Sequence, residues 1–164
     1  MTRRPWRTAG SVELLVPAPP EAVYELVSDV TRIGERSAEC HTAGWLDGAP
    51  PRTVGAVFRG RNRAGRLARW TRRCEVLEAD TGRAFVFRTL PEREPTRRDS
   101  TTWGYRIEPA DGGSRVTHFY EITRLPLQPF RALFGVLLPD HRDMRPQMLR
   151  NLEALRDQLS RAPH

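Results

Sequence analysis

The candidate proton-transfer residues of the sequence are Glu39, Tyr105 and His118. A carboxylate and an imidazole can act as general base and acid, and a phenol hydroxyl can polarise a ketone. Together they would suit an aldol-type ring closure. Nothing in their spacing requires them to meet. A lone histidine in a strand is more often a surface or hydrogen-bonded core residue, so we favour the structural interpretation over catalysis.

Arg72 stands out because alternate residues from Trp70 to Val76 point to one side of a strand. This alternation puts a guanidinium on an apolar face, where a charge is costly without a partner. A planar guanidinium fits a ligand carboxylate or phosphate. The alternative, which we favour, is a structural ion pair with Glu39 or Glu121, or a strand bulge that turns Arg72 outward.

Aromatic residues on neighbouring predicted strands share that face by the same alternation. Large aromatic side chains each bury about 150–250 Å² and commonly line sites for flat apolar ligands. The alternative is that these rings pack directly on a helix and leave no cavity. With Arg72, the residues that we predict to form a ligand site are Phe58, Trp70, Phe85, Phe87, Trp103 and Tyr105.

The C-terminal segment Leu125–Ala162 is the element on which these strands must pack. Met144, Met148, Leu152, Leu155 and Leu159 recur at spacings of 4, 4, 3 and 4, which is one apolar stripe of an amphipathic helix. A half-apolar sheet has to bury one face, and this helix is the obvious partner. Pro146 either lies in the first turn of the helix or kinks it.

The upstream segment reads as one strand, two short helices and six strands. Val12, Leu14 and Val16 alternate in a first strand over Ser11–Val16, and helical spacing follows over Pro20–Ser28 and Val30–Glu35. Turn-forming residues separate the later strands, and residues 91–99 read as a loop. The predicted strands are Cys40–Leu46, Val54–Asn62, Arg66–Ala79, Arg83–Leu90, Ser100–Glu108 and Ser114–Arg124.

Composition places the chain among globular proteins. Its 164 residues are 38% hydrophobic and 29% charged, enough for one domain, which we assign to residues 11–162 after a basic leader at 1–10. No apolar run approaches a membrane span or a signal peptide, so the expected location is the cytoplasm. Cys40 and Cys74 lack metal-ligand spacing, and we expect two buried thiols without a disulfide or metal. Residues 60–65 read as a hairpin turn rather than a phosphate loop.

The net charge is +7, and all 27 basic residues are arginine. Such a surface can contact nucleic acid or anionic membranes. The alternative is codon bias in a GC-rich genome, which we favour because the arginines are scattered and no nucleic-acid motif frames them. The apolar segment Ala132–Leu138 could contact a membrane surface or mediate dimerisation. We favour the interpretation that it forms the start of the C-terminal helix or a flap at the mouth of a pocket.

Several sequence segments together resemble the START-like superfamily, which is also called Bet v 1-like or polyketide cyclase/dehydrase (SRPBCC). The resemblance is to its small actinobacterial members. The segments are PPEAVYELVSDVTRIGERSAEC at 19–40, VGAVFRGRNR at 54–63, WTRRCEV at 70–76, GRAFVFR at 82–88 and RNLEALR at 150–156. Relatives often carry a Trp and a Pro within 34–40 that this chain lacks. The resemblance implies an α+β helix-grip fold, in which a seven-stranded curved antiparallel sheet wraps the C-terminal helix around an apolar pocket.

Three functions remain open. The leading hypothesis is binding or transport of a hydrophobic lipid- or polyketide-like molecule, without a cofactor, by a monomer or homodimer. The second is a metal-free polyketide cyclase or aromatase using pocket groups such as Tyr105, Arg72 and Glu39. The third is an arginine-rich adaptor for a protein, an anionic membrane or nucleic acid. If the protein is a carrier, we expect an almost wholly apolar cavity. If it is an enzyme, we expect titratable groups that converge in the cavity. If it is an adaptor, we expect a filled core and one coherent basic face.

Overall fold

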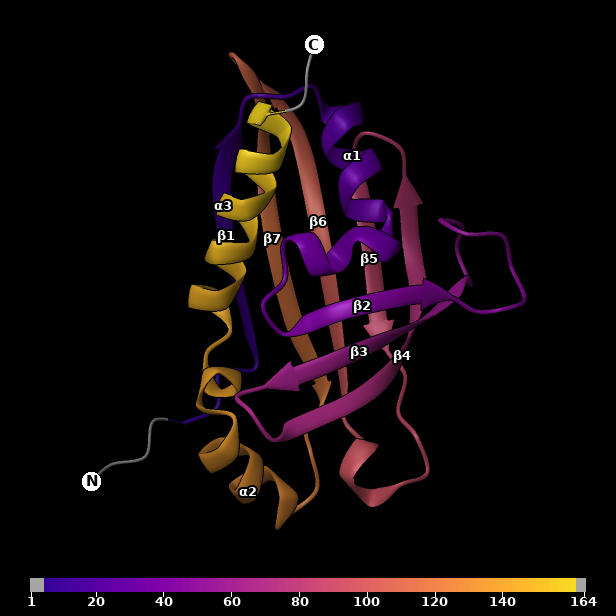
Figure 1. The fold of residues 1–164 in the computed structure, drawn as a ribbon, viewed down its shortest axis with the longest axis vertical. Coiled ribbons are helices and arrows are strands. Elements are labelled where there is room, and N and C mark those ends of the chain that lie inside the picture. Colours follow the sequence, from indigo (N-terminus) through magenta and orange to yellow (C-terminus); the bar gives the residue numbers. More distant parts are fainter. Residues whose placement is uncertain (1–4, 162–164) are drawn as a thin grey trace.

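The computed structural model of the protein describes residues 5–161. Seven antiparallel strands form one sheet in the order β1-β7-β6-β5-β4-β3-β2, and helices cover one of its faces (Figure 1). This arrangement is the helix-grip fold that the resemblance implied. The elements are β1 (Ala9–Val16), α1 (Pro20–Ser28), η1 (Val30–Glu35), β2 (Cys40–Trp45), β3 (Val57–Ala64), β4 (Ala68–Asp80), β5 (Ala84–Thr89), η2 (Pro95–Arg97), β6 (Ser100–Ala110), β7 (Gly113–Arg124), α2 (Phe130–Leu137), η3 (Pro139–Arg142) and α3 (Arg145–Arg161).

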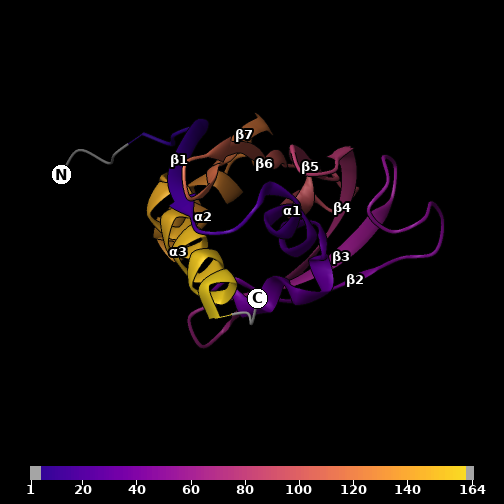
Figure 2. The same ribbon diagram turned by 90° about the horizontal axis from the view of Figure 1, so that it is seen from above.

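The sheet is a meander from β2 to β7, closed at its far edge by β1, which pairs with β7. Register shifts interrupt the ladder at Cys40/Thr42, Val76/Glu78 and Ser100/Thr101. Such irregularities bend a strand and increase its twist. Seen from above, the sheet curves around α1, with α3 on the side of β1 (Figure 2). The curvature creates the concave face on which the site is built.

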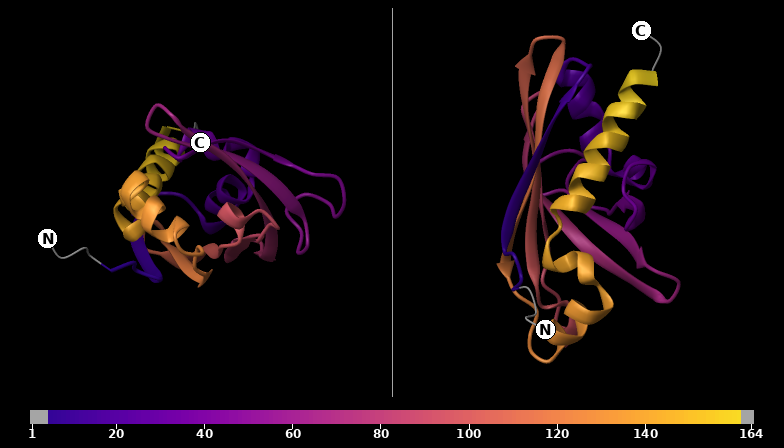
Figure 3. Two further views of the ribbon diagram at one scale, coloured as in Figure 1. Left: turned by 90° about the horizontal axis from the view of Figure 1, so that it is seen from below. Right: turned by 90° about the vertical axis from the view of Figure 1, so that its left-hand side faces the viewer.

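The predicted apolar stripe is the buried face of α3, where Met148, Leu152 and Leu155 are buried. The long helix begins only at Arg145, because Pro129 and Pro139 divide the preceding segment into α2 and the 3₁₀ turn η3. From the side, α3, η3 and α2 follow one another down one face of the sheet (Figure 3). The end of the predicted segment, Ala162, lies outside the described residues.

The core fills only part of the space between sheet and helices. The two helices predicted after β1 have the bounds observed for α1 and η1, and α1 buries Val23, Leu26 and Val27. Side chains of α1 and Val30 of η1 pack in one large hydrophobic cluster with residues of β5, β6 and the C-terminal half of α3. A smaller cluster near the start of α3 contains Tyr120, Met144 and Met148. The cavity lies between these two clusters and the strands β2 to β4.

Residues 7–10 form hydrogen bonds or strand pairs with the rest of the chain. Arg7 N–H donates to the Arg142 carbonyl, and the Tyr120 hydroxyl donates to the Arg7 carbonyl. Strand β1 already begins at Ala9. The first four residues of the expected basic leader lie outside the described part of the chain. No helix within residues 5–161 is long and apolar enough to cross a membrane.

Candidate functional site

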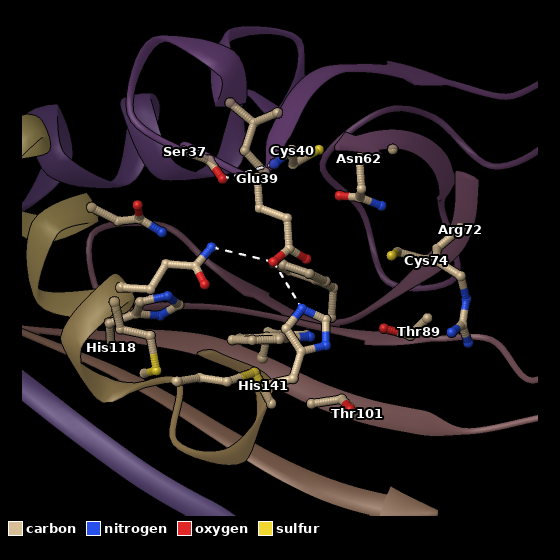
Figure 4. Close-up of a pocket in the computed structure, with 18 of the residues that line it drawn as sticks. Ser37, Glu39, Cys40, Asn62, Arg72, Cys74, Thr89, Thr101, His118 and His141 are labelled. Carbon is tan, nitrogen blue, oxygen red and sulfur yellow. Dashed lines mark hydrogen bonds and ion pairs between the residues drawn. The ribbon is translucent and has the colours of Figure 1, made fainter. Parts of the chain in front are cut away.

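An inner cavity of about 180 Å³ lies between the concave face of the sheet and the segment from η3 into α3 (Figure 4). Most of the predicted ligand-site residues line it, so alternation identified the correct face of four strands. These residues are Phe58, Trp70, Arg72, Phe87, Trp103 and Tyr105. Ring contacts connect part of this wall, such as the edge-to-face pair of Phe58 and Phe87 with centroids 5.2 Å apart.

Phe85 is the predicted ligand residue that the structure does not place at the cavity. Its side chain is fully buried and meets Tyr24 of α1 edge-on, with ring centroids 6.5 Å apart. Phe85 shares the concave face with Phe87, as alternation required. However, α1 covers that end of β5, so the space in front of Phe85 is filled by core.

An outer cavity of about 400 Å³ adjoins the inner one. It is bordered by the β3–β4 turn at Leu67, the loop that contains η2, and Phe134, Leu137 and Leu138 around α2. Ligand pockets usually measure about 300–1,000 Å³, so the inner cavity alone suits a small group or part of a larger molecule. Both cavities share the residues Trp70, Arg72, Asp99, Thr101, His141 and Met144.

Arg72 is held by a partner that the sequence analysis did not name. Its Nη1 donates to both carboxylate oxygens of Asp99 at 2.9 and 3.0 Å, and its Nη2 donates to the Asp99 carbonyl at 2.8 Å and the Leu90 carbonyl at 3.3 Å. The expected partners Glu39 and Glu121 were therefore wrong. The loop before β6 folds back and brings Asp99 to β4. Because protein acceptors already bind both terminal nitrogens, Arg72 contributes a polar part of the cavity wall rather than a free pair of donors for a ligand carboxylate or phosphate.

Glu39 pairs with His141, which the sequence analysis missed. The His141 Nε2 and Glu39 Oε2 atoms are 2.8 Å apart, and the Gln147 amide lies 3.5 Å from the same oxygen (Figure 4). Burial by itself lowers the pKa of His141. The hydrogen bond and charge of Glu39, with smaller contributions from Asp99 and Asp140, outweigh burial and raise that pKa above its ordinary value. The pair can thus hold a proton on the imidazole next to a carboxylate.

His118 does not pair with Glu39 as the catalytic hypothesis required. Its Nδ1 lies 2.9 Å from the Gly104 carbonyl, which only accepts, so Nδ1 carries the proton and Nε2 a lone pair. The ring stacks on Tyr105 with centroids 4.2 Å apart and planes 3° apart. Burial, aided by the charge of Arg36 and opposed by the Gly104 carbonyl, lowers the pKa of His118 to about 4. His118 is therefore a neutral acceptor.

One signal could have revealed His141. It precedes Met144 by three residues and Met148 by seven, so it extends the apolar stripe of α3 backward by one turn. The other missed polar residues carry no comparable signal, because they lie just after η1, on strands, in the loop before β6 or on α3 outside its predicted apolar stripe. They are Arg36, Ser37, Asn62, Thr89, Asp99, Thr101, Gln147 and Asn151.

Both cysteines line the inner cavity as thiols; Cys74 is buried, as expected, whereas Cys40 is half-buried. Desolvation by burial raises the pKa of Cys40 to about 11 and that of Cys74 to about 12. A thiol that stays protonated is a poor nucleophile. Within residues 5–161, no group of three or more His, Cys, Asp or Glu side chains is arranged to hold a metal ion.

The sequence matches one known protein family over nearly its whole length. Residues 7–159 match the family described as polyketide cyclase / dehydrase and lipid transport. The chain belongs to this family. The match covers nearly the whole domain, including every element that lines the cavities. It confirms the START-like resemblance seen in the sequence. No curated protein matches the chain.

Solved structures of similar fold include members with described activities. The Zhui aromatase/cyclase from Streptomyces sp. R1128 is 18% identical with a TM-score of 0.65, over 93% of both chains. The di-domain aromatase/cyclase StfQ of the steffimycin biosynthetic pathway is 13% identical with a TM-score of 0.70, over 96% of this chain and 52% of that one. A protein from Thermus thermophilus, TTHA0849, is 22% identical with a TM-score of 0.65, over 95% of this chain and 99% of that one. These similarities establish the fold.

Proposed function

We propose that this family member binds a flat, oxygenated hydrophobic molecule, with one ring system in the inner cavity and the remainder in the outer one. The observation that carries this proposal is the stack of His118 on Tyr105 in a cavity wall that also contains Trp103. Stacked rings favour a planar ligand. The bare Nε2 of His118 accepts a hydrogen bond from a ligand hydroxyl.

The polar wall argues for an oxygenated ligand rather than a plain hydrocarbon chain. A carrier of purely apolar molecules would have an almost wholly apolar cavity, whereas this one contains the Glu39–His141 pair and amides from Asn62 and Gln147. Covering the remaining donors and acceptors of these side chains with a hydrocarbon would leave those atoms without hydrogen-bond partners, which is unfavourable. A polyketide-like molecule, with alternating oxygens on a planar frame, satisfies both kinds of wall.

The first test is native mass spectrometry of the purified protein, followed by denaturing extraction of any bound molecule. The second compares 1-naphthol with 1-methoxynaphthalene, which has similar rings but no hydroxyl donor. A single hydrogen bond is worth about 0.5–1.5 kcal/mol, so naphthol should bind about 2- to 12-fold more tightly. His118→Phe keeps a ring on Tyr105 but removes the acceptor, and should abolish this preference. Equal affinity of both probes for the wild-type protein would contradict the proposal.

A second candidate function is ring closure of a linear poly-β-ketone, favoured by the Glu39–His141 pair. The Glu39 carboxylate would take a proton from a methylene between two ketones. The resulting carbanion would attack another ketone, forming a carbon–carbon bond, and the alkoxide would take the proton of the His141 imidazolium. Both groups line the inner cavity, within reach of one bound molecule.

The test measures ring closure of a synthetic linear poly-β-ketone by its ultraviolet absorption. General acid–base catalysis contributes about 10²–10⁴-fold, so Glu39→Gln and His141→Gln should each lower the rate by at least about 100-fold. Cys40→Ala serves as the control, since it alters the same wall without removing either proton-transfer group. A wild-type rate equal to that in buffer would leave binding as the function.

A further inference from the structure

Six exposed arginines gather on the β3–β4 hairpin. The inward residues Phe58, Gly60 and Asn62 of β3 line the inner cavity, so the residues between them point to the outer face of the sheet. The same alternation applies to β4, and Arg66 lies in the turn. We call this set the arginine hairpin: Arg59, Arg61, Arg63, Arg66, Arg69 and Arg73.

The register brings these like charges together. Arg59 lies opposite Arg73, and Arg63 lies opposite Arg69. Directly opposed like charges destabilise a sheet. The sequence offers no relief nearby, because no acidic residue occurs between Asp47 and Glu75. Such a surface is stabilised when an external anion neutralises it.

Three exposed arginines on other strands of the sheet are neutralised by the protein itself. Arg88 pairs with Glu75 at 2.8 Å, Arg106 with Glu78 at 2.6 Å, and Arg115 with Glu13 at 3.3 Å. Within residues 5–161, no member of the arginine hairpin has an ion pair within 4.0 Å. The arginines are scattered along the sequence, as noted above, but in space these six lie together on one hairpin.

Large apolar side chains are exposed beside this charge. Leu67, in the turn of the arginine hairpin, is 95% exposed, and on α2 Leu133, Val136 and Leu137 are 49%, 60% and 60% exposed. Leu67 and Leu137 both border the outer cavity, so the two apolar groups lie on one rim. The segment around α2 also lacks acidic residues, with none between Glu121 and Asp140. We call these four residues the apolar rim.

We propose that the arginine hairpin and the apolar rim dock on an anionic lipid bilayer, with the mouth of the outer cavity toward the membrane. Arginine is attracted to anionic headgroups, and exposed aliphatic side chains insert at the boundary of the acyl chains. Nucleic acid would use the charge but not the exposed leucines and valine, so the combination favours the bilayer. This docking goes beyond ligand binding, and it stands whichever molecule the cavity holds.

The test measures binding to vesicles of phosphatidylcholine with and without phosphatidylglycerol by flotation. Binding should require phosphatidylglycerol and weaken as salt rises. Each arginine near such a surface contributes about fivefold in affinity, so Arg63→Gln/Arg66→Gln/Arg69→Gln should bind about 100-fold more weakly. The matched control is Arg88→Gln/Arg106→Gln/Arg115→Gln. Both variants lower the formal charge from +7 to +4, since three arginines are lost in each, but the control should retain most of the affinity.

The apolar rim is tested by Leu67→Ser/Leu137→Ser on the same vesicles. Its affinity should fall about tenfold or more while the salt dependence of the remaining binding persists, since the arginines are intact. The proposal is overturned if the two triple variants lose equal affinity, or if pure phosphatidylcholine binds equally well. It is also overturned if double-stranded DNA binds more tightly than the anionic vesicles at the same salt. Sedimentation showing a dimer that Leu67→Ser/Leu137→Ser dissociates would instead assign the apolar rim to self-association.

Discussion

Replacing His118 should change how the stability of the protein depends on pH. Burial lowers the pKa of His118 from 6.5 to about 4, so as pH falls the unfolded chain binds a proton before the native protein does. The contribution of the neutral ring to stability is therefore fully present above pH 6.5 and is lost as pH falls toward 4. The loss is about 1.4 kcal/mol per pH unit, or about 3 kcal/mol in total.

The assay is urea denaturation of wild type and His118→Phe at several pH values between 7.5 and 4.5. The variant loses the hydrogen bond to the Gly104 carbonyl, which shifts its stability by a similar amount at every pH. All other titrating groups, including His141, are present in both proteins and largely cancel in the difference. We expect the stability advantage of the wild type to shrink as pH falls below 6.5. A constant difference, or an NMR pKa of His118 near 6.5, would refute the reasoning.

Two further predictions concern the polar walls. Asp99→Ala should destabilise the protein by about 2 kcal/mol in the same denaturation assay, because it leaves the mostly buried Arg72 charge without its carboxylate; a loss no larger than that of the exposed pair variant Glu78→Ala would contradict this. Glu39→Gln should lower the pKa of His141 measured by NMR, because the hydrogen bond and charge that raise it are removed; an unchanged pKa would show that the pair does not form in solution.

Local patterns predicted the elements of this fold because those patterns reflect local physical causes. The helical spacing of apolar residues predicted α1, η1 and the buried stripe of α3. Alternation gave the inward face of the strands, including Phe58 and Trp103. Alternation cannot say what lies above that face. Phe85 and Phe87 point the same way, yet α1 covers one and the cavity adjoins the other.

Pairings between distant residues were beyond the sequence analysis. Glu39 and His141 are separated by 102 positions, and their contact depends on how η3 lies against the start of β2. Asp99 reaches Arg72 through a loop whose path no periodicity encodes. The opposed arginines are a different case. The predicted turn at Ala64–Gly65 would already pair Arg63 with another arginine, Arg66. The observed register, in which Ala64 lies opposite Ala68, puts Arg63 opposite Arg69 instead.

Two polar groups of the cavity wall, His118 and the Glu39–His141 pair, differ in charge, and in the proposed complex this difference orients the ligand. His118 is a neutral acceptor among aromatic rings, so it favours the hydroxyl-bearing ring of a molecule that has left water. The Glu39–His141 pair lies where the inner cavity adjoins the outer one, and His141 lines both. A molecule that spans the two cavities must therefore pass this pair. Its oxygen atoms would compete there with the carboxylate for the imidazole proton. In the proposed ring closure, the reactive part of the poly-β-ketone would therefore lie at the junction rather than beside His118.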